Sequence, residues 1–446
     1  MSDPTLVQAH ADPSGHATRL PPGPSIPKLV QGFWFALARR QMIDRLTRRY
    51  GDAYTIKLPT VGTVVVVTDP DLAKQTFQVS PEELGILRPN LSDRLLGPGS
   101  VFALDGADHR RRRDQLSPPF HGRSVRRFEQ VFVEETLRET ADWPIERRFE
   151  TLEPMLRIAL NAMLRGIFGA EGSELGELRQ IIPPWVTLGQ RLTTLPMPRR
   201  TFGRFTPWGR LAELRRRYEV VLDELIARAL ADPNFADRND VLSILLRSTD
   251  EDGHPMSRGD IGDELLTFLA AGHETTAATL AWVFERISRE PELLAALTAE
   301  ADSSENSLRR ATIREVQRTR TVVDFTGRHV YAPTIRLGDW VIPRGSSVMV
   351  FISQIHVNPA AFDHPAEFEP QRFVGASPQA STWIPYGGGT RRCPGASFAN
   401  IGMDVVLRTV LRQFVIVPTV ASAEKRHARG VAFTPKDGGR IVIRHR

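Results

Sequence analysis

Residues 383–396, which read WIPYGGGTRRCPGA, place the only cysteine of the chain in a glycine-rich bend. Three glycines precede Cys393, two arginines adjoin it, and an apolar-periodic segment begins at about Ala396. The pattern predicts a sulfur presented just before a helix N-terminus, where a thiolate is stabilised. Such a cysteine is a candidate nucleophile, redox thiol or axial metal ligand. The alternative is a buried, inert thiol.

The spacing around Cys393 narrows these choices. Gly389 lies four residues before it, Gly395 two after it and Tyr386 seven before it. At ordinary glycine content, both glycines fall at such places by chance about once in two hundred cases. Glycines that let the backbone approach a flat ligand, and N–H groups that point at sulfur, suit a haem-thiolate loop. The segment, Gly387 included, resembles the cysteine-ligand signature of the cytochrome P450 family. Tyr386 stands where phenylalanine is usual, and its hydroxyl could form a hydrogen bond near the sulfur.

A helix of unusual length is predicted over residues 260–290. Small and hydroxyl side chains share one face of it, namely Gly272, Thr275, Thr276 and Thr279. The glycine leaves room for a flat ligand or O₂, and Glu274 beside Thr275 is a pair suited to relaying protons. The run from Ala271 to Thr275 resembles the oxygen-binding pattern of the same family. This implies catalytic roles for Glu274 and Thr275, and haem contact for Ala271, Gly272 and Thr275.

A basic segment begins at His109. His109 and Arg113 are spaced i, i+4 and would share a helix face, with Arg110, Arg111 and Arg112 facing outward. The simpler alternative is a solvated basic face. The family resemblance implies that His109 and Arg113 bind the haem propionates, and it implies the same role for Arg328 and Arg391.

Two further features concern structure rather than chemistry. Glu315 and Arg318, with Arg372 in a Pro-x-Arg-Phe segment, resemble the buried cluster that fixes the cysteine loop in the family. Thr321 stands where many relatives have proline, which puts the turn after Arg318 in doubt. His356 is expected to be a structural hydrogen-bonding residue.

Charge and hydropathy limit the partners. A net charge of +6 raises nucleic acid as a partner. The arginines are scattered among 52 acidic residues and no familiar nucleic-acid module is present, so nucleic acid is disfavoured. Neither a signal-peptide core nor an apolar run of about 20 residues is found, which predicts a soluble, cytoplasmic protein. Residues 1–20 are expected to be a disordered leader, and 196–207 to be a lid, a peripheral membrane contact or an ordinary connection.

The resemblance covers about residues 20 to 446 and is strongest to bacterial members such as those of mycobacteria. It implies a mostly α-helical domain with a small β subdomain over 21–446, with haem b between the long helix and the cysteine loop. Cys393 would ligate the iron. The expected activity is O₂-dependent hydroxylation of a lipophilic small molecule, with electrons from a ferredoxin and a ferredoxin reductase. A haem-thiolate isomerase or peroxygenase and a non-enzymatic haem-based ligand-binding protein are the alternatives.

Overall fold

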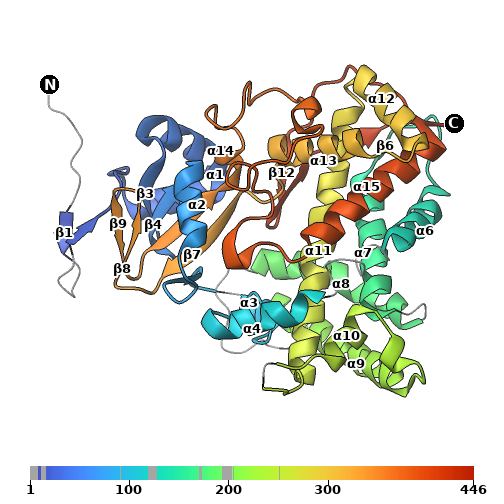
Figure 1. Ribbon diagram of the computed structural model, residues 1–446, viewed down its shortest axis with the longest axis horizontal. Helices are drawn as coiled ribbons and strands as arrows, with labels where there is room; N and C mark the ends of the chain where they lie inside the picture. The colour runs from blue at the N-terminus through green and yellow to red at the C-terminus, as the bar shows by residue number, and fades with distance from the viewer. Residues whose placement is uncertain are drawn as a thin grey trace.

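The computed structural model describes residues 9–11, 17–90, 92–118, 128–169, 173–192, 203, 205–250 and 252–446. Most elements are helices, and the larger sheets lie together at one side of the molecule (Figure 1). The expected mostly helical architecture with a small β portion is confirmed. Among the described residues, none of the helices combines the length and apolarity that crossing a bilayer requires.

The described helices of eight or more residues, in chain order, are α1 (Lys28–Tyr50), α2 (Pro70–Gln78), α4 (Gly106–Leu116), α6 (Phe128–Thr140), α7 (Leu152–Phe168), α8 (Ser173–Leu192), α9 (Pro207–Ala231), α11 (Arg258–Ile287), α12 (Pro291–Asp302), α13 (Ser307–Thr319) and α15 (Ala396–Gln413). Shorter helices are α3 (Ser92–Leu96), α10 (Val241–Arg247) and α14 (Ile352–Ile355).

The largest sheet has the strand order β3-β4-β10-β7-β5, formed by β3 (Ala53–Leu58), β4 (Gly62–Val67), β10 (Ser347–Phe351), β7 (Phe325–Val330) and β5 (Leu84–Ile86). A second sheet contains β1 (Ala9–Ala11), β2 (Ala17–Arg19), β9 (Trp340–Pro343) and β8 (Thr334–Leu337). Three two-stranded sheets pair β11 (Phe414–Ile416) with β15 (Ile443–His445), β12 (Arg426–Arg429) with β13 (Ala432–Pro435), and β14 (Arg440–Ile441) with β6 (Phe149–Glu150).

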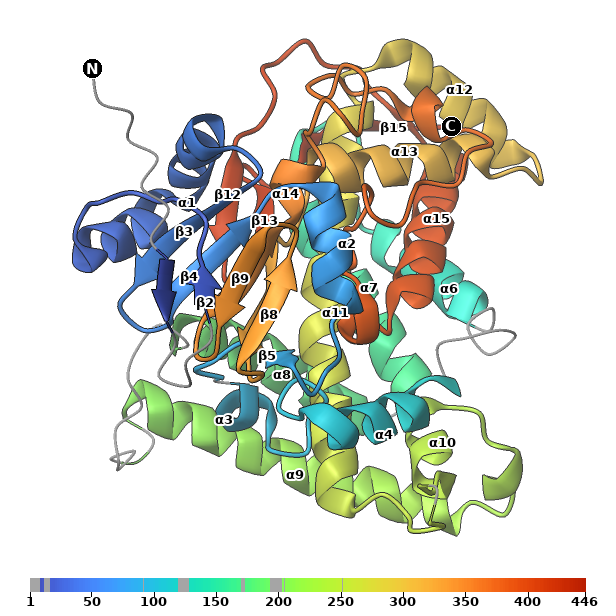
Figure 2. The same ribbon diagram turned by 60° about the vertical axis from the view of Figure 1, so that its left-hand side comes forward.

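The long helix α11 runs through the middle of the molecule, with other helices and the β12–β13 hairpin around it (Figure 2). Ser257 caps it, because the Ser257 hydroxyl accepts the Asp260 N–H at 3.1 Å. The helix begins and ends two to three residues earlier than the predicted 260–290. A helix buried on nearly all sides needs a specific reason for any position that stays accessible.

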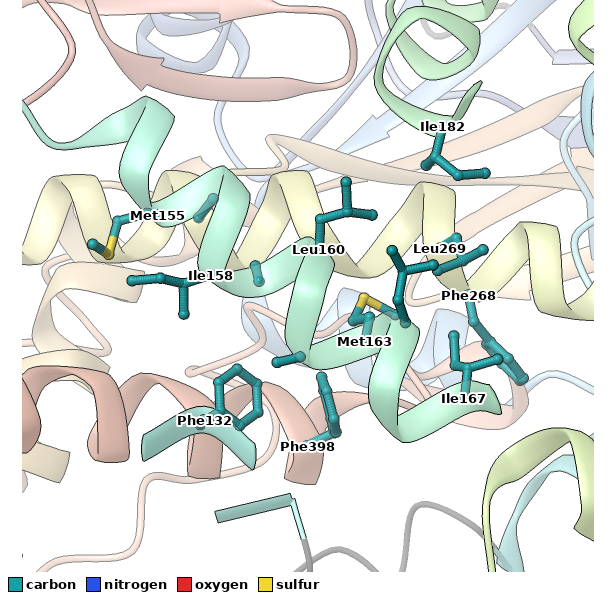
Figure 3. Packing of buried hydrophobic residues seen from close by; sticks show 14 of the residues in the cluster. Phe132, Met155, Ile158, Leu160, Met163, Ile167, Ile182, Phe268, Leu269 and Phe398 are labelled. Atoms are coloured by element: carbon teal, nitrogen blue, oxygen red, sulfur yellow. The ribbon is translucent and has the colours of Figure 1, made fainter. Parts of the chain in front are cut away.

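The helical core joins α6, α7, α11 and α15. Figure 3 shows Met163 of α7 close to Leu269 of α11, and Phe132 of α6 beside Phe398 of α15. The Phe132 and Phe398 ring centroids are 5.1 Å apart. This packing sets the position of the start of α15, directly after the cysteine loop.

Two expectations concern segments near the limits of the described residues. Much of the expected leader, 1–20, lies outside them, but 9–11 and 17–19 form β1 and β2, and β2 pairs with β9. The expected disorder of the leader stays a prediction. Most of 196–207 also lies outside the described residues, so its expected role stays a prediction.

Gly402 tests the α6–α15 packing. A Cβ at Gly402 would lie 2.4 Å from the ring of Phe132, which is fully buried and has no room to retreat. Gly402→Ala should therefore lower the free energy of unfolding by about 1–3 kcal/mol, although the same change in an open helix stabilises by up to about 1 kcal/mol. Urea denaturation measures the difference.

The matched control is Gly176→Ala in α8, where a Cβ would meet no atom within 4 Å. This variant should be as stable as the parent or more so. Equal effects of the two substitutions would contradict the close approach of α6 and α15.

Candidate functional site

The cysteine loop closes on itself immediately before α15. The Cys393 N–H donates to the Tyr386 carbonyl at 2.9 Å, and the Arg392 N–H donates to the Gly389 carbonyl at 3.1 Å. Gly395 is the N-cap residue of α15, as the sequence pattern predicts. The loop thus holds the sulfur at a helix N-terminus, where the peptide dipoles favour negative charge.

The glycines of the loop serve two different purposes. Gly387 and Gly389 both have positive φ, at 67° and 66°, which favours glycine. A Cβ at Gly388 would meet the Phe77 ring of α2, and one at Gly389 would lie 2.4 Å from the Phe77 carbonyl oxygen. Beside Gly387 and Gly395, by contrast, a Cβ would meet nothing within 4 Å. Gly388 and Gly389 thus leave room for the close approach of α2, whereas Gly387 and Gly395 border open space.

The Tyr386 hydroxyl has other hydrogen-bond partners than the expected bond near the sulfur. The hydroxyl accepts from the Gln317 amide of α13 at 2.7 Å and donates to the Asn400 carbonyl oxygen of α15 at 2.5 Å. Both partners are on neighbouring helices, so this hydroxyl ties the loop to α13 and α15. Burial, followed by the nearby Cys393, raises the pKa of the phenol.

The Cys393 sulfur is accessible although it lies deep among protein atoms. Burial raises the pKa of the thiol, while a hydrogen bond from the Gly395 N–H and the guanidinium groups of Arg113 and Arg392 act to lower it. Because the pKa of the free thiol is raised, those groups alone do not ionise it. A cation bound directly to the sulfur would, since metals take cysteine as the thiolate.

Cations gather beside the loop around His109. The His109 ring is 2% exposed, and its Nδ1 atom has no hydrogen-bond partner. Burial and then the charges of Arg391 and Arg113 lower the pKa of His109 to about 3. Arg113 itself is half-buried, and burial lowers the pKa of its guanidinium. The predicted pairing of His109 with Arg113 on one face of α4 is consistent with this arrangement.

Arg328 and Arg391 complete the group of cations. Burial, then Arg391, lowers the pKa of Arg328 to about 10, and its side chain donates to Thr326 and to the Gly327 carbonyl, both at 2.8 Å. Arg391 donates to Asp105 at 2.6 Å. Asp105 is the carboxylate that offsets these charges, and it also accepts from Tyr331 at 2.8 Å. Three guanidinium groups and one carboxylate leave an excess of positive charge, which favours an anionic ligand.

Arg112 does not face outward, so that expectation was wrong. Its side chain is 10% exposed and pairs with Glu264 at 3.0 Å and with Asp260 at 3.2 Å, both on α11. Arg112 is three residues after His109, and residues spaced i, i+3 share a helix face just as i, i+4 residues do. Arg110 and Arg111 are exposed as predicted, but they pair with Glu82 and Asp108.

The centre of α11 has one accessible face. Ala271, Gly272 and Thr275 are partly accessible, whereas the residues from Ile261 to Leu269 and from Thr276 to Phe284 are buried. The Thr275 hydroxyl donates to the Ala271 carbonyl at 2.9 Å. Thr276 and Thr279 follow on the same helix at the expected spacing but are buried, so the accessible part of the face ends at Thr275. The side of Gly272 on which a Cβ would stand is taken by Met163, at 2.6 Å.

Glu274 lies on a different side of α11 from this accessible face. Its side chain is 6% exposed and forms an ion pair with Arg429 of β12, with 3.7 Å between Nε and the carboxylate. Glu274 and Thr275 are adjacent in the chain but have different neighbours. The structure therefore brings the predicted pair together through the backbone and not through a direct hydrogen bond.

The predicted Glu315–Arg318–Arg372 cluster is present. Glu315 and Arg318 have fully buried side chains 2.7 Å apart, and Arg372 approaches Glu315 at 3.3 Å. Thr321 supports the turn after Arg318, because its hydroxyl lies 3.0 Å from the Arg318 carbonyl. The turn that looked doubtful without proline is thus held by a side-chain hydrogen bond.

His356 connects this cluster to the cysteine loop. Its Nε2 accepts the Ile384 N–H at 3.0 Å, and its Nδ1 lies 3.0 Å from the Thr321 hydroxyl. Since Nε2 accepts, the proton of the neutral ring is on Nδ1. Burial and then Arg318 lower the pKa of His356 to about 3, so the ring stays neutral in the folded protein.

Sequence reasoning missed Asp105 and Arg429. Asp105 stands four residues before His109, a spacing that places both on one side of the start of α4 and could have identified it. Arg429 and Glu274 are 155 residues apart in the sequence, and no local sequence pattern predicts their contact.

The residues present fit a flat, anionic cofactor bound through sulfur. The accessible sulfur, the open sides of Gly387 and Gly395, the unpartnered His109 nitrogen and the excess of buried cations all agree with a haem held by a thiolate and by its propionates. Fold and site together therefore define the class of haem-thiolate proteins.

Comparison with known proteins identifies the family. The model of the family described as "Cytochrome P450" matches residues 21–440. Cytochrome P450 138 of Mycobacterium tuberculosis is 60% identical over 436 residues, which are 98% of this chain and 99% of that protein. Cytochrome P450 135B1 of the same species is 34% identical over 95% of this chain and 91% of that protein. The chain belongs to the cytochrome P450 family, whose members are haem-thiolate proteins.

Solved structures support the fold. A cyanobacterial protein, CYP120A1 with bound retinoic acid, matches with a TM-score of 0.81 and 22% identity over 96% of this chain and 99% of that one. The haem domain of cytochrome P450DA matches with a TM-score of 0.80 and 20% identity, over 96% and 98% of the two chains. At this identity the likeness concerns the fold alone.

His356 gives a pH prediction. Its pKa is about 3 when folded, against 6.5 for an ordinary histidine, so its contribution to stability is complete above pH 6.5 and is lost as pH falls toward 3. His356→Gln should remove about 1.4 kcal/mol per pH unit from the slope of unfolding free energy against pH in that window. Denaturant unfolding across the window measures it.

The control is His427→Gln, which replaces an exposed histidine of β12. It should leave the slope as in the parent protein. A His356→Gln slope equal to the parent slope would contradict the neutral, buried ring.

Proposed function

We propose that this protein is a monooxygenase that uses haem b, activates O₂ with electrons from separate redox partners, and hydroxylates an apolar small molecule. The single observation that carries the proposal is the exposed Cys393 at the start of α15, beside guanidinium groups that outnumber the carboxylates near them among the described residues. Residues 21–446 would act as one catalytic unit. A haem b would bring both the iron that takes a thiolate and the two carboxylates that such cations bind.

The residues that would hold the haem come from three parts of the chain. Cys393 would bind the iron through its sulfur, and Gly387 and Gly395 would let the backbone approach the ring. The propionates would be bound by His109, Arg113, Arg328 and Arg391. When bound, the haem supplies the oxidising chemistry, and electron donation from the thiolate favours O–O cleavage.

The chain itself would supply orientation and protons. Ala271, Gly272 and Thr275 form the accessible face of α11, and the Thr275 hydroxyl, which donates to Ala271, keeps a lone pair free to accept another hydrogen bond. Glu274 would pass protons to this face. A haem-thiolate isomerase, a peroxygenase or a non-enzymatic ligand-binding protein has less need of such a carboxyl–hydroxyl pair, so the pair favours the monooxygenase.

Electrons would come from a ferredoxin and a ferredoxin reductase, because the sequence holds no flavin- or nicotinamide-binding fingerprint and no set of cysteines for an iron–sulfur cluster. Arg392, exposed beside the cysteine, is the natural centre of a docking face for an acidic ferredoxin. Arg110 and Arg111 are exposed but already paired with acids of this chain, and the buried Arg112 takes no part.

The substrate would be a lipophilic molecule, and the protein would act in the cytoplasm.

Peripheral contact with a membrane is supported by apolar side chains on α1, where Leu29, Phe33 and Leu37 are 59%, 67% and 84% exposed at helical spacing. Sedimentation with anionic lipid vesicles tests that contact. A protein that remains wholly in the supernatant would contradict it.

Cys393→Ser tests the proposed function. Serine keeps the shape of the side chain but removes the sulfur, so haem-dependent hydroxylation should fall to the level of the haem-free protein. The apoprotein should keep its stability within about 0.5 kcal/mol, as expected for an accessible side chain. The assay is incorporation of ¹⁸O from ¹⁸O₂ with NADPH, ferredoxin and reductase, using a substrate found by its spin-state shift.

Ser397→Ala changes the exposed second residue of α15; this variant is the control and should hydroxylate at the parental rate. Hydroxylation by Cys393→Ser at a comparable rate would rule out the proposed role of the sulfur.

A further inference from the structure

Three arginines from separate parts of the chain gather near one buried carboxylate. Arg39 belongs to α1, Arg320 follows α13 and Arg426 begins β12. The Asp324 side chain is 3% exposed, and its oxygens lie 3.7 Å from Arg39 and 3.5 Å from Arg426. Arg320 is close enough for its charge to act on that of Arg426, and it has no ion pair among the described residues. In this group, the Asp324 cluster, three positive charges share one negative charge.

Nearby acids do not balance the cluster. Each of the other arginines that act on it already has a carboxylate partner, in the pairs Arg40–Asp44, Arg286–Glu290 and Arg289–Glu285. Burial, together with the neighbouring guanidinium groups, lowers the pKa of Arg320 and that of Arg426 to about 10. Both side chains stay charged at neutral pH, so their repulsion remains in the folded protein.

Aromatic rings hold the three guanidinium groups by their faces and leave their edges free. The guanidinium carbons lie over ring centroids, at 5.4 Å for Arg39 on Phe433, 4.8 Å for Arg426 on the same ring and 5.3 Å for Arg320 on Trp282. Guanidinium N–H groups lie in the plane of the group, so a ring face satisfies none of them. The Nε atoms of Arg39 and Arg426 are buried without a hydrogen-bond partner among the described residues.

The carboxylate at the centre also lacks a hydrogen bond. The Oδ1 atom of Asp324 is buried and has no donor within hydrogen-bond reach among the described residues. A ligand that fits the cluster therefore needs two properties, negative charge for the guanidinium edges and one hydrogen-bond donor for Asp324. A water molecule supplies the donor but leaves the excess of positive charge in place.

We propose that the Asp324 cluster binds a phosphate group that keeps a P–OH, either inorganic phosphate or a phosphate monoester. The ionised oxygens accept hydrogen bonds from the edges of Arg39, Arg320 and Arg426, and the P–OH donates to Oδ1 of Asp324. Planar guanidinium groups match phosphate oxygens in geometry as well as in charge. This site lies beyond the proposed function and uses none of the residues assigned to the haem.

The buried carboxylate decides which anion fits. Inorganic phosphate keeps at least one P–OH at neutral pH, and a phosphate monoester keeps one in its singly ionised form. Sulfate has lost both protons at this pH, so it offers Asp324 no donor and is repelled by the carboxylate. The cluster should therefore select phosphate over sulfate, although the two ions have similar shape.

Equilibrium dialysis of the holoprotein against radiolabelled inorganic phosphate tests the site. Bound haem keeps the cations around His109 from contributing. The expected result is saturable binding of one phosphate per chain that an equal concentration of sulfate does not displace. Arg320→Gln and Arg426→Gln should each weaken binding about tenfold or more. Arg48→Gln removes the same charge from an exposed position of α1 and should bind as the parent does.

Asp324→Asn tests the selectivity. An amide N–H can donate to a fully ionised oxygen, so sulfate should displace phosphate from this variant as well as unlabelled phosphate does. Far-ultraviolet circular dichroism checks that the variants fold, and the comparison of the two anions in the parent needs no variant. No saturable phosphate binding by the parent, equal displacement by sulfate there, or unchanged affinity in a folded Arg320→Gln would overturn the proposal.

Sedimentation with vesicles of phosphatidylcholine and phosphatidic acid distinguishes the two sources of the phosphate group. Binding to the vesicles that free phosphate inhibits, and that Arg320→Gln loses while Arg48→Gln keeps it, identifies a lipid headgroup as the ligand. Saturable binding in dialysis without such sedimentation identifies the free ion. Each of these results supports the site, and the absence of both would contradict it.

Discussion

The buried guanidinium of Arg318 is the interaction on which the site depends. It pairs with Glu315 and donates to the carbonyls of His356, Pro365 and Glu367, at 2.9, 2.7 and 2.8 Å. The segment that leads to the cysteine loop has little regular structure, so its carbonyls need such a partner. Burying an ion pair this fully costs desolvation free energy. The hydrogen bonds of Arg318 nevertheless hold the chain before Cys393 in a fixed position.

Arginines with similar surroundings in the sequence have different roles, and their partners decide which. Arg112 faces Asp260 and Glu264, so its charge is balanced and it joins α4 to α11. Arg113, the next residue, lies near His109, Arg391 and Cys393, where positive charge is in excess. Adjacent positions on one helix thus have different roles: Arg112 is a structural cation, and Arg113 is available to an anionic ligand.

The sequence allowed a good prediction wherever the signal was local. The bend before α15 and the long α11 follow from the pattern along one segment, whereas the Glu315–Arg318–Arg372 cluster was indicated by the family resemblance. Prediction failed where the contact is made in three dimensions. The hydroxyl of Tyr386 finds Gln317 and Asn400 on two other helices, and Arg429 meets Glu274 across the hairpin, so neither arrangement could be predicted without the packing.

The central claim is that Cys393 supplies a thiolate to a haem iron. The carbon monoxide difference spectrum of the reduced holoprotein tests it most directly, because the position of the Soret band reports the ligand opposite carbon monoxide. A strongly red-shifted Soret band that Cys393→Ser lacks is the predicted result. A band at the position given by a neutral nitrogen or water ligand in the parent protein, or no haem bound at all, would contradict the account.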